Sequence, residues 1–145
     1  MTKKRILSND RGSIKGVVPA VVLFHLEKHL KRISNNPNSR IHDYFDLFAG
    51  ASTGAIIIAG LLTPDSHNQP KYTTKEIIDL YIENGHIIFN ASLFQEIKSV
   101  SGLVNVKYDP EGLESVFNKY FGNTQLKDLL KPTLIPVYEL SRGKN

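Results

Sequence analysis

A serine flanked by two glycines is the part of this sequence whose pattern most directly predicts chemistry. Residues 50–54 read Gly-Ala-Ser-Thr-Gly, between an apolar run expected to be a strand and an apolar run expected to be a helix. A serine on such a sharp turn has strained backbone and a hydroxyl above the sheet, and small neighbours avoid collision. Ser52 is therefore a candidate nucleophile, with Gly50 and Gly54 as the turn glycines. The alternative is a small-residue turn in which Ser52 only caps the helix.

A second turn lies near the N-terminus, again between an expected strand and an expected helix. Residues 10–16 read Asp-Arg-Gly-Ser-Ile-Lys-Gly. This segment has neither the G-x-G-x-x-G pattern of dinucleotide sites nor the glycines and Lys-Ser/Thr pair of a nucleotide phosphate loop. A nucleotide site is therefore not predicted here.

The elements that must position these two turns alternate between strand and helix. The sequence predicts strands over 4–8, 44–49 and 133–140. The spacing of apolar residues, and the residues that start or end helices, predict four helices. They cover about 17–34, 55–62, a segment that begins at Thr73 or Thr74, and Pro110 to Gly122. A short helical turn is expected over 126–130, and a less regular stretch over 89–106, with His86 closing the helix before it. This order predicts an α/β fold with a mainly parallel sheet.

Composition narrows the functional classes. The 145 residues support a single domain. The absence of cysteine excludes disulfides, thiolate nucleophiles and cysteine zinc sites. The net charge of +4 is compatible with an anionic partner such as nucleic acid. The Lys and Arg residues are scattered along the sequence, however, which does not favour such a partner. Lys28, Lys31 and Arg32 come at the expected end of a helix, where a solvated surface is the favoured interpretation.

Targeting and membrane signals are weak in this sequence. The N-terminus has charges but no apolar core of a signal peptide. Residues 47–64 are uncharged and, at about 18 residues, approach the length of a membrane span. Their glycines and hydroxyl residues favour a buried strand and helix joined by a turn. Localisation stays open between the cytoplasm and export by another route.

Three segments together resemble the patatin-like phospholipase family over nearly the whole chain. They are ILSNDRGSIKGVVPAVVLFHLE, DYFDLFAGASTGAIIIAGLL and YDPEGLESVFNKYFGNTQLKDLLKPTLIPVYEL. The family has a D-G-G-G-x-R-G loop after its first strand and a G-x-S-x-G turn after the next. The resemblance implies a three-layer α/β fold and a serine esterase that hydrolyses lipid esters, some at a membrane surface. It implies a Ser–Asp dyad, with no cofactor and no metal. The scattered cations, for their part, predict no nucleic-acid partner.

The family's oxyanion loop maps onto residues 10–16. The resemblance places the oxyanion hole at Gly12, Ser13 and Gly16, with Arg11 and Lys15 in the same loop. Arg11 stands where the family has its first glycine, and Ser13 where it has its third. A Cβ at a position that needs positive φ is unfavourable, so we expect a distorted hole.

The dyad aspartate of the family lies in an Asp-Gly pair, and this sequence contains none. We therefore expect an incomplete patatin-like domain, truncated at its C-terminus, that alone is weakly active or inactive. The alternative is a degenerate fragment that at most binds lipid or protein.

Histidine chemistry gives two weaker alternatives. A Ser-His-Asp hydrolase would need an aspartate and then a histidine after Ser52, and His67 and His86 do follow it. Both come soon after the serine, so this alternative is less favoured. His25 and His29 lie one helical turn apart, but without a third ligand an exposed helix face is the better interpretation.

Overall fold

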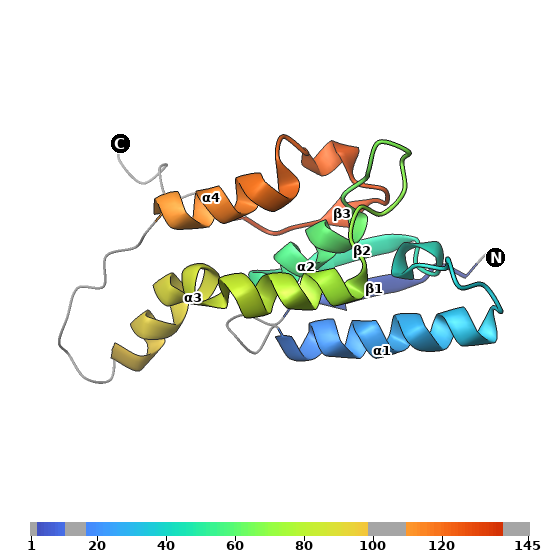
Figure 1. Ribbon diagram of the computed structural model, residues 1–145, viewed down its shortest axis with the longest axis horizontal. Helices are drawn as coiled ribbons and strands as arrows, with labels where there is room; N and C mark the ends of the chain where they lie inside the picture. Colours follow the sequence, from blue (N-terminus) through green and yellow to red (C-terminus); the bar gives the residue numbers. More distant parts are fainter. Residues whose placement is uncertain (1–2, 11–16, 99–109, 138–145) are drawn as a thin grey trace.

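The computed structural model describes residues 3–10, 17–98 and 110–137. The strands are β1 (Ile6–Asn9), β2 (Leu47–Gly50) and β3 (Thr133–Leu134). The helices are α1 (Val17–Ile33), α2 (Thr53–Leu62), α3 (Thr74–Lys98) and α4 (Pro110–Phe121), with short 3-10 turns η2 (Ile41–Asp43) and η3 (Leu126–Asp128). Figure 1 shows their arrangement. The α/β order predicted from the sequence is confirmed.

The three strands form one parallel sheet in the order β1-β2-β3. Asn9 pairs with Gly50, and Ala49 pairs with Leu134. The carboxyl ends of all three strands therefore lie at one edge of the sheet. The turn at residues 50–54 and the segment that follows β1 both leave from this edge.

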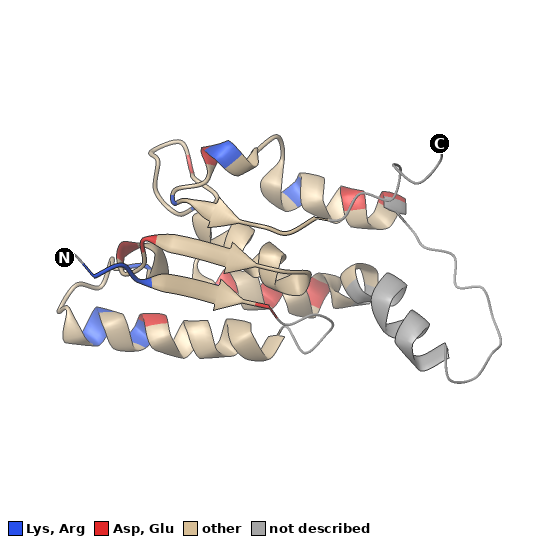
Figure 2. Cartoon of the chain, turned by 180° about the vertical axis from the view of Figure 1, so that it is seen from behind, with Lys and Arg blue, Asp and Glu red and all other residues tan. Residues whose placement is uncertain are grey.

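Helices cover one face of the sheet, and that face holds the core. Phe48 of β2 is fully buried, together with Ile57, Ile58 and Leu62 of α2. Figure 2, seen from behind, shows β1 and β2 in front of α2 and α3. On the opposite face of the sheet the described residues leave apolar side chains exposed to solvent. Ile6 and Leu134 lie on that face and are 59% and 62% exposed. The described residues thus form two layers, a sheet and one layer of helices.

A buried carboxylate joins α1 to the segments around it. Glu27 is 4% exposed, and its carboxylate lies 3.3 Å from Lys31 Nζ and 3.6 Å from Arg40 Nη1. It also accepts hydrogen bonds from the Ile41 amide at 3.3 Å and the Thr74 hydroxyl at 3.2 Å. The expectation that Lys31 only solvates the surface is therefore wrong, because its ammonium group neutralises a buried acid.

Several element boundaries differ from those expected, most of all those of α3, β2 and β3. α3 continues to Lys98, so residues 89–98 are helical and His86 lies within the helix rather than at its end. The rest of the expected irregular stretch, residues 99–106, lies outside the described residues. Residues 86–98 contain no proline or glycine to stop a helix. β2 begins at Leu47 because Tyr44 still caps η2, with its amide bonded to the carbonyl of Ile41 at 3.1 Å.

β3 is shorter than expected, with only Thr133 and Leu134 in the ladder. The expected strand covered residues 133–140; residues 135–137 are outside the ladder, and residues 138–140 lie outside the described residues. Pro136 follows soon after Leu134, and a proline cannot donate a ladder hydrogen bond.

The uncharged stretch over 47–64 divides into β2 and α2, as the sequence predicted. No helix in the described ranges is long and apolar enough to cross a membrane. Figure 2 shows the Lys and Arg residues interspersed with Asp and Glu rather than gathered into one patch.

Candidate active site

Ser52 lies on a sharp turn between the end of β2 at Gly50 and the start of α2 at Thr53. Its φ is 54° and its ψ is −128°, and the residue is exposed. A non-glycine residue in such backbone costs about 1–3 kcal/mol and persists only where its surroundings hold it. The Ser52 side chain makes no capping hydrogen bond to α2, so the structure does not support the helix-cap alternative.

The two turn glycines are required by the space around them. A Cβ built on Gly50 would lie 2.7 Å from the carbonyl oxygen of Gly54. A Cβ built on Gly54 would lie 2.0 Å from the carbonyl oxygen of Asn9. Both neighbouring atoms belong to the backbone, which cannot move aside as a flexible side chain can. The G-x-S-x-G spacing therefore follows from close packing of the turn against itself and against β1.

Hydrogen bonds hold the turn from two sides. On one side the Ala51 amide donates to the carbonyl of Asn9 at 3.1 Å, which ties the turn to β1. On the other side the buried hydroxyl of Tyr81, from α3, donates to the carbonyl of Thr53 at 2.6 Å. Burial raises the pKa of Tyr81, so its hydroxyl stays protonated and remains a donor.

The residues assigned to the oxyanion hole lie outside the described residues. These are Gly12, Ser13 and Gly16, with Arg11 and Lys15 beside them. The register nevertheless locates the start of their loop. Asn9 is paired with Gly50, so the chain leaves β1 directly beside the turn that carries Ser52.

His67 is not assembled with Ser52. It lies in the loop after α2, whereas Ser52 precedes α2, and ten helical residues span about 15 Å. The Asp65 carboxylate beside it accepts the amides of His67 and Gln69 at 2.8 and 2.9 Å. These hydrogen bonds lower the pKa of Asp65. The Asp65 carboxylate therefore stabilises the loop in which it lies. This arrangement gives no support to a Ser-His-Asp triad through His67.

The other histidine pair also lies away from this site. His25 and His29 are exposed on α1, and Arg32 donates to His29 Nδ1 at 3.0 Å. Across the described ranges, no group of three His, Cys, Asp or Glu side chains is placed to hold a metal ion.

The described residues place no base beside the candidate nucleophile Ser52. Within these residues the Ser52 hydroxyl has no hydrogen-bond partner. Ser52 directly precedes α2, whose Gly54 and Ala55 amides donate to the carbonyls of Ala51 and Ser52, and the dipole at a helix N-terminus favours negative charge. The arrangement can therefore stabilise an anion near Ser52, while activation of the hydroxyl needs a further group.

Sequence reasoning missed two side chains that support this site. Asn9 ends β1 in a buried position, with its Nδ2 atom unpartnered among the described residues. Tyr81 reaches the turn from 28 positions further along the chain. A polar residue at the end of an apolar strand was a signal for Asn9, but no local pattern connects Tyr81 to residue 53.

Comparison with known proteins places this chain in a family. A family model described as patatin-like phospholipase matches residues 12–143. Patatin-like protein 4 from Arabidopsis thaliana is 35% identical over 137 residues, which is 94% of this chain and 34% of that protein. Patatin group M-3 from Solanum tuberosum and Patatin-17 from Solanum cardiophyllum are each 34% identical over 139 residues, 96% of this chain and 34% of theirs. The chain thus spans about a third of the length of these relatives. With residues 12–143 matched and the serine turn built as described, the chain belongs to the patatin-like phospholipase family.

Proposed function

We propose that Ser52 is the nucleophile of a lipid acyl hydrolase. The observation that carries this proposal is the exposed serine at φ 54°, held between two glycines that the surrounding backbone requires. Structural serines have no need of strained backbone, whereas a nucleophile on a strand-to-helix turn does. Membership of the patatin-like phospholipase family supports a lipid ester as the substrate.

In the proposed reaction the Ser52 oxygen attacks the ester carbonyl carbon and its proton passes to a carboxylate base. The oxyanion that forms is stabilised by amides of the loop containing Gly12, Ser13 and Gly16, a contribution of about 3–4 kcal/mol per donor in comparable sites. The alcohol leaves with the proton, and water then releases the acyl group from Ser52. Arg11, at a glycine position of the family loop, makes this hole weaker than that of an all-glycine loop.

The base is the incomplete part of the site. The family's dyad aspartate lies in an Asp-Gly pair, which these 145 residues lack. We propose that the dyad aspartate is supplied from outside this sequence. Loss of one member of such a catalytic unit costs on the order of 10⁴ in rate, so these residues alone would turn over slowly.

The second candidate function is a lipid-binding fragment without catalysis. The absence of a partner for the Ser52 hydroxyl within the described residues favours it. The two candidates differ in one respect, which is whether Ser52 reacts at all.

Hydrolysis of a short-chain p-nitrophenyl ester by the 145-residue chain separates them. We expect slow hydrolysis that Ser52→Ala abolishes and that rises with added acetate, because a small carboxylate can take the place of the missing base. Sodium chloride at equal ionic strength is the control. Hydrolysis that is unchanged in Ser52→Ala, or no Ser52-dependent hydrolysis even with acetate, would favour the non-catalytic fragment.

A further inference from the structure

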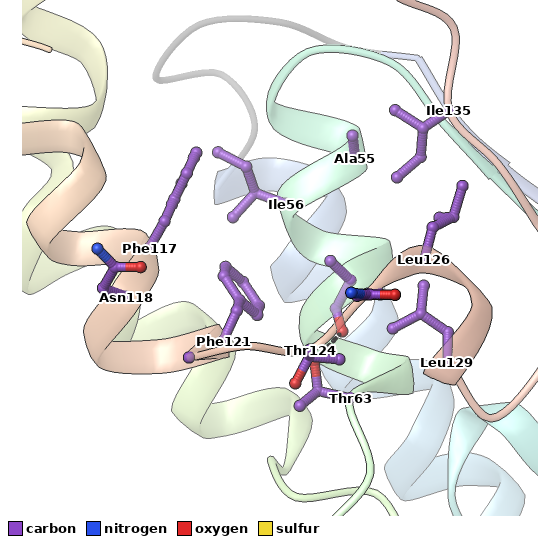
Figure 3. A pocket seen from close by; sticks show the side chains of 13 residues that line it. Ala55, Ile56, Thr63, Phe117, Asn118, Phe121, Thr124, Leu126, Leu129 and Ile135 are labelled. Atoms are coloured by element: carbon purple, nitrogen blue, oxygen red, sulfur yellow. Dashed lines mark hydrogen bonds between the residues drawn. The ribbon is translucent and has the colours of Figure 1, made fainter.

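An apolar groove of about 380 Å³ runs along the side of α2 that faces α4 and η3. Figure 3 shows Ala55 and Thr63 at its two ends, with Phe117 and Phe121 on one wall and Leu129 on the other. Its volume lies in the range of small-molecule sites, about 300–1,000 Å³. Among the residues that the structure describes, no charged one lines it.

One end of this groove adjoins the serine turn. The Ala55 amide, at that end, donates to the carbonyl of Ser52 at 2.9 Å. Ile135 also lines this end and directly follows Leu134, which pairs with Ala49. Ile135 therefore lies at the level of Gly50 in the sheet, two residues before the candidate nucleophile. A chain bound in the groove would begin beside Ser52.

The other end of the groove lies at Thr63, with Thr124 beside it. The Thr63 hydroxyl donates to the carbonyl of Ala59 at 2.8 Å, so this hydroxyl already has an acceptor within α2. The Leu130 amide donates to the carbonyl of Leu62 at 3.0 Å and fixes the η3 segment against the end of α2. From Ala55 to Thr63 the chain advances by about 12 Å along the axis of α2, which is the length of helix that the groove follows.

We propose that this groove holds the acyl chain of the ester that Ser52 attacks, with Ala59 setting how far the chain reaches. The proposal rests on the proposed function for its reaction, but its ligand chemistry comes from the groove itself. Its apolar, uncharged walls suit an alkyl chain, and the adjacent N-terminus of α2 suits a carboxylate or an oxyanion. A second groove of about 490 Å³ between β1 and α1 includes Asp10 in its lining and is less suited to an alkyl chain.

Binding of a fluorescent fatty acid, cis-parinaric acid, to Ser52→Ala tests the proposal without any chemistry. In that background we expect Ala59→Phe to weaken binding about tenfold, as when roughly two methylene groups no longer fit. Val22→Phe, which fills the second groove instead, is the matched control and should leave binding within about twofold. Weakening by Val22→Phe and not by Ala59→Phe, or no binding in Ser52→Ala, would overturn the assignment of this groove.

A series of alkyl fluorophosphonates provides a second readout on the active chain. The labelling rate of Ser52 should rise about fourfold per added methylene until the groove is full. Ala59→Phe should shorten the chain length at which the rate levels off, and Phe121→Ala, which opens a wall, should lengthen it. If the labelling rate levels off at the same alkyl chain length in the unmodified chain, in Ala59→Phe and in Phe121→Ala, the proposal is overturned.

The two proposals fail in different ways. Fatty-acid binding that Ala59→Phe blocks, together with unreactive Ser52, would leave the groove assigned and contradict the proposed function. Labelling that depends on Ser52 but is unchanged by Ala59→Phe and Phe121→Ala would support the proposed function and contradict the assignment of the groove.

Discussion

The carbonyl oxygen of Asn9 occupies the space that a side chain on Gly54 would need, since a Cβ there would lie 2.0 Å from it. The last residue of β1 is thus in contact with the first turn of α2. Because the Asn9 carbonyl also accepts the Ala51 amide, one residue of β1 supports the turn at two points. The position of Ser52 therefore depends on β1 as much as on its own strand.

Replacing Gly54 with alanine should displace this contact. We expect Gly54→Ala to lower the free energy of unfolding by about 3 kcal/mol, because the clash is with backbone. Urea denaturation measures the change. Gly60→Ala is the matched control, since its Cβ would meet only the Ile77 side chain, at 3.1 Å and beyond. Equal effects of the two variants would contradict the close packing of β1 against the turn.

Strain at Ser52 should make the protein less stable than a variant that relieves it. We expect Ser52→Gly to raise the free energy of unfolding by about 1 kcal/mol over Ser52→Ala, because glycine tolerates φ 54°. Both variants remove the hydroxyl, so both should lose all reactivity at this position. A Ser52→Gly protein no more stable than Ser52→Ala would show that the turn is not strained.

The buried carboxylate of Glu27 should contribute strongly to stability. Glu27→Ala would leave the Ile41 amide and the Thr74 hydroxyl without their acceptor and two cations without a partner. We expect a loss of about 3 kcal/mol in the free energy of unfolding by chemical denaturation. Glu114→Ala, at an exposed position of α4, should change it by less than about 0.5 kcal/mol. If Glu27→Ala and Glu114→Ala lower the free energy of unfolding by similar small amounts, Glu27 is not held by its four partners.

The fold and the site differ in how far the sequence could predict them. The turn at 50–54 was predictable because its requirements are local, namely two glycines, a serine and apolar runs on either side. The Glu27 network was not, because Arg40 and Thr74 reach it from 13 and 47 positions away. The support of Thr53 by Tyr81 depends in the same way on how α3 packs. Periodicity shows which face of a helix is buried but not which polar group it will meet.

His42 should make stability depend on pH. Burial lowers the pKa of His42 below 6.5, against the opposing effect of Asp43, and Lys131 and Arg40 lower it further. The folded protein therefore binds this proton less readily than the unfolded chain does. Stability should rise with pH from the lowered pKa up to about 6.5, where the unfolded histidine loses its proton.

Unfolding midpoints between pH 5 and pH 7 check this dependence, a range in which ordinary carboxylates stay ionised. His42→Gln should flatten the rise. His67→Gln is the control, because the His67 side chain is 83% exposed, and it should leave the rise intact. An unchanged slope in His42→Gln would contradict the assignment.

The central claim is that Ser52 is a nucleophile, and the site of covalent labelling tests it most directly. The 145-residue chain would be incubated with a fluorophosphonate, digested, and the modified peptide identified by mass spectrometry. We expect the phosphonate on Ser52, in preference to the exposed Ser8 of neighbouring β1, and no adduct on this peptide in Ser52→Ala. A folded chain in which Ser52 reacts no faster than Ser8 would contradict the claim.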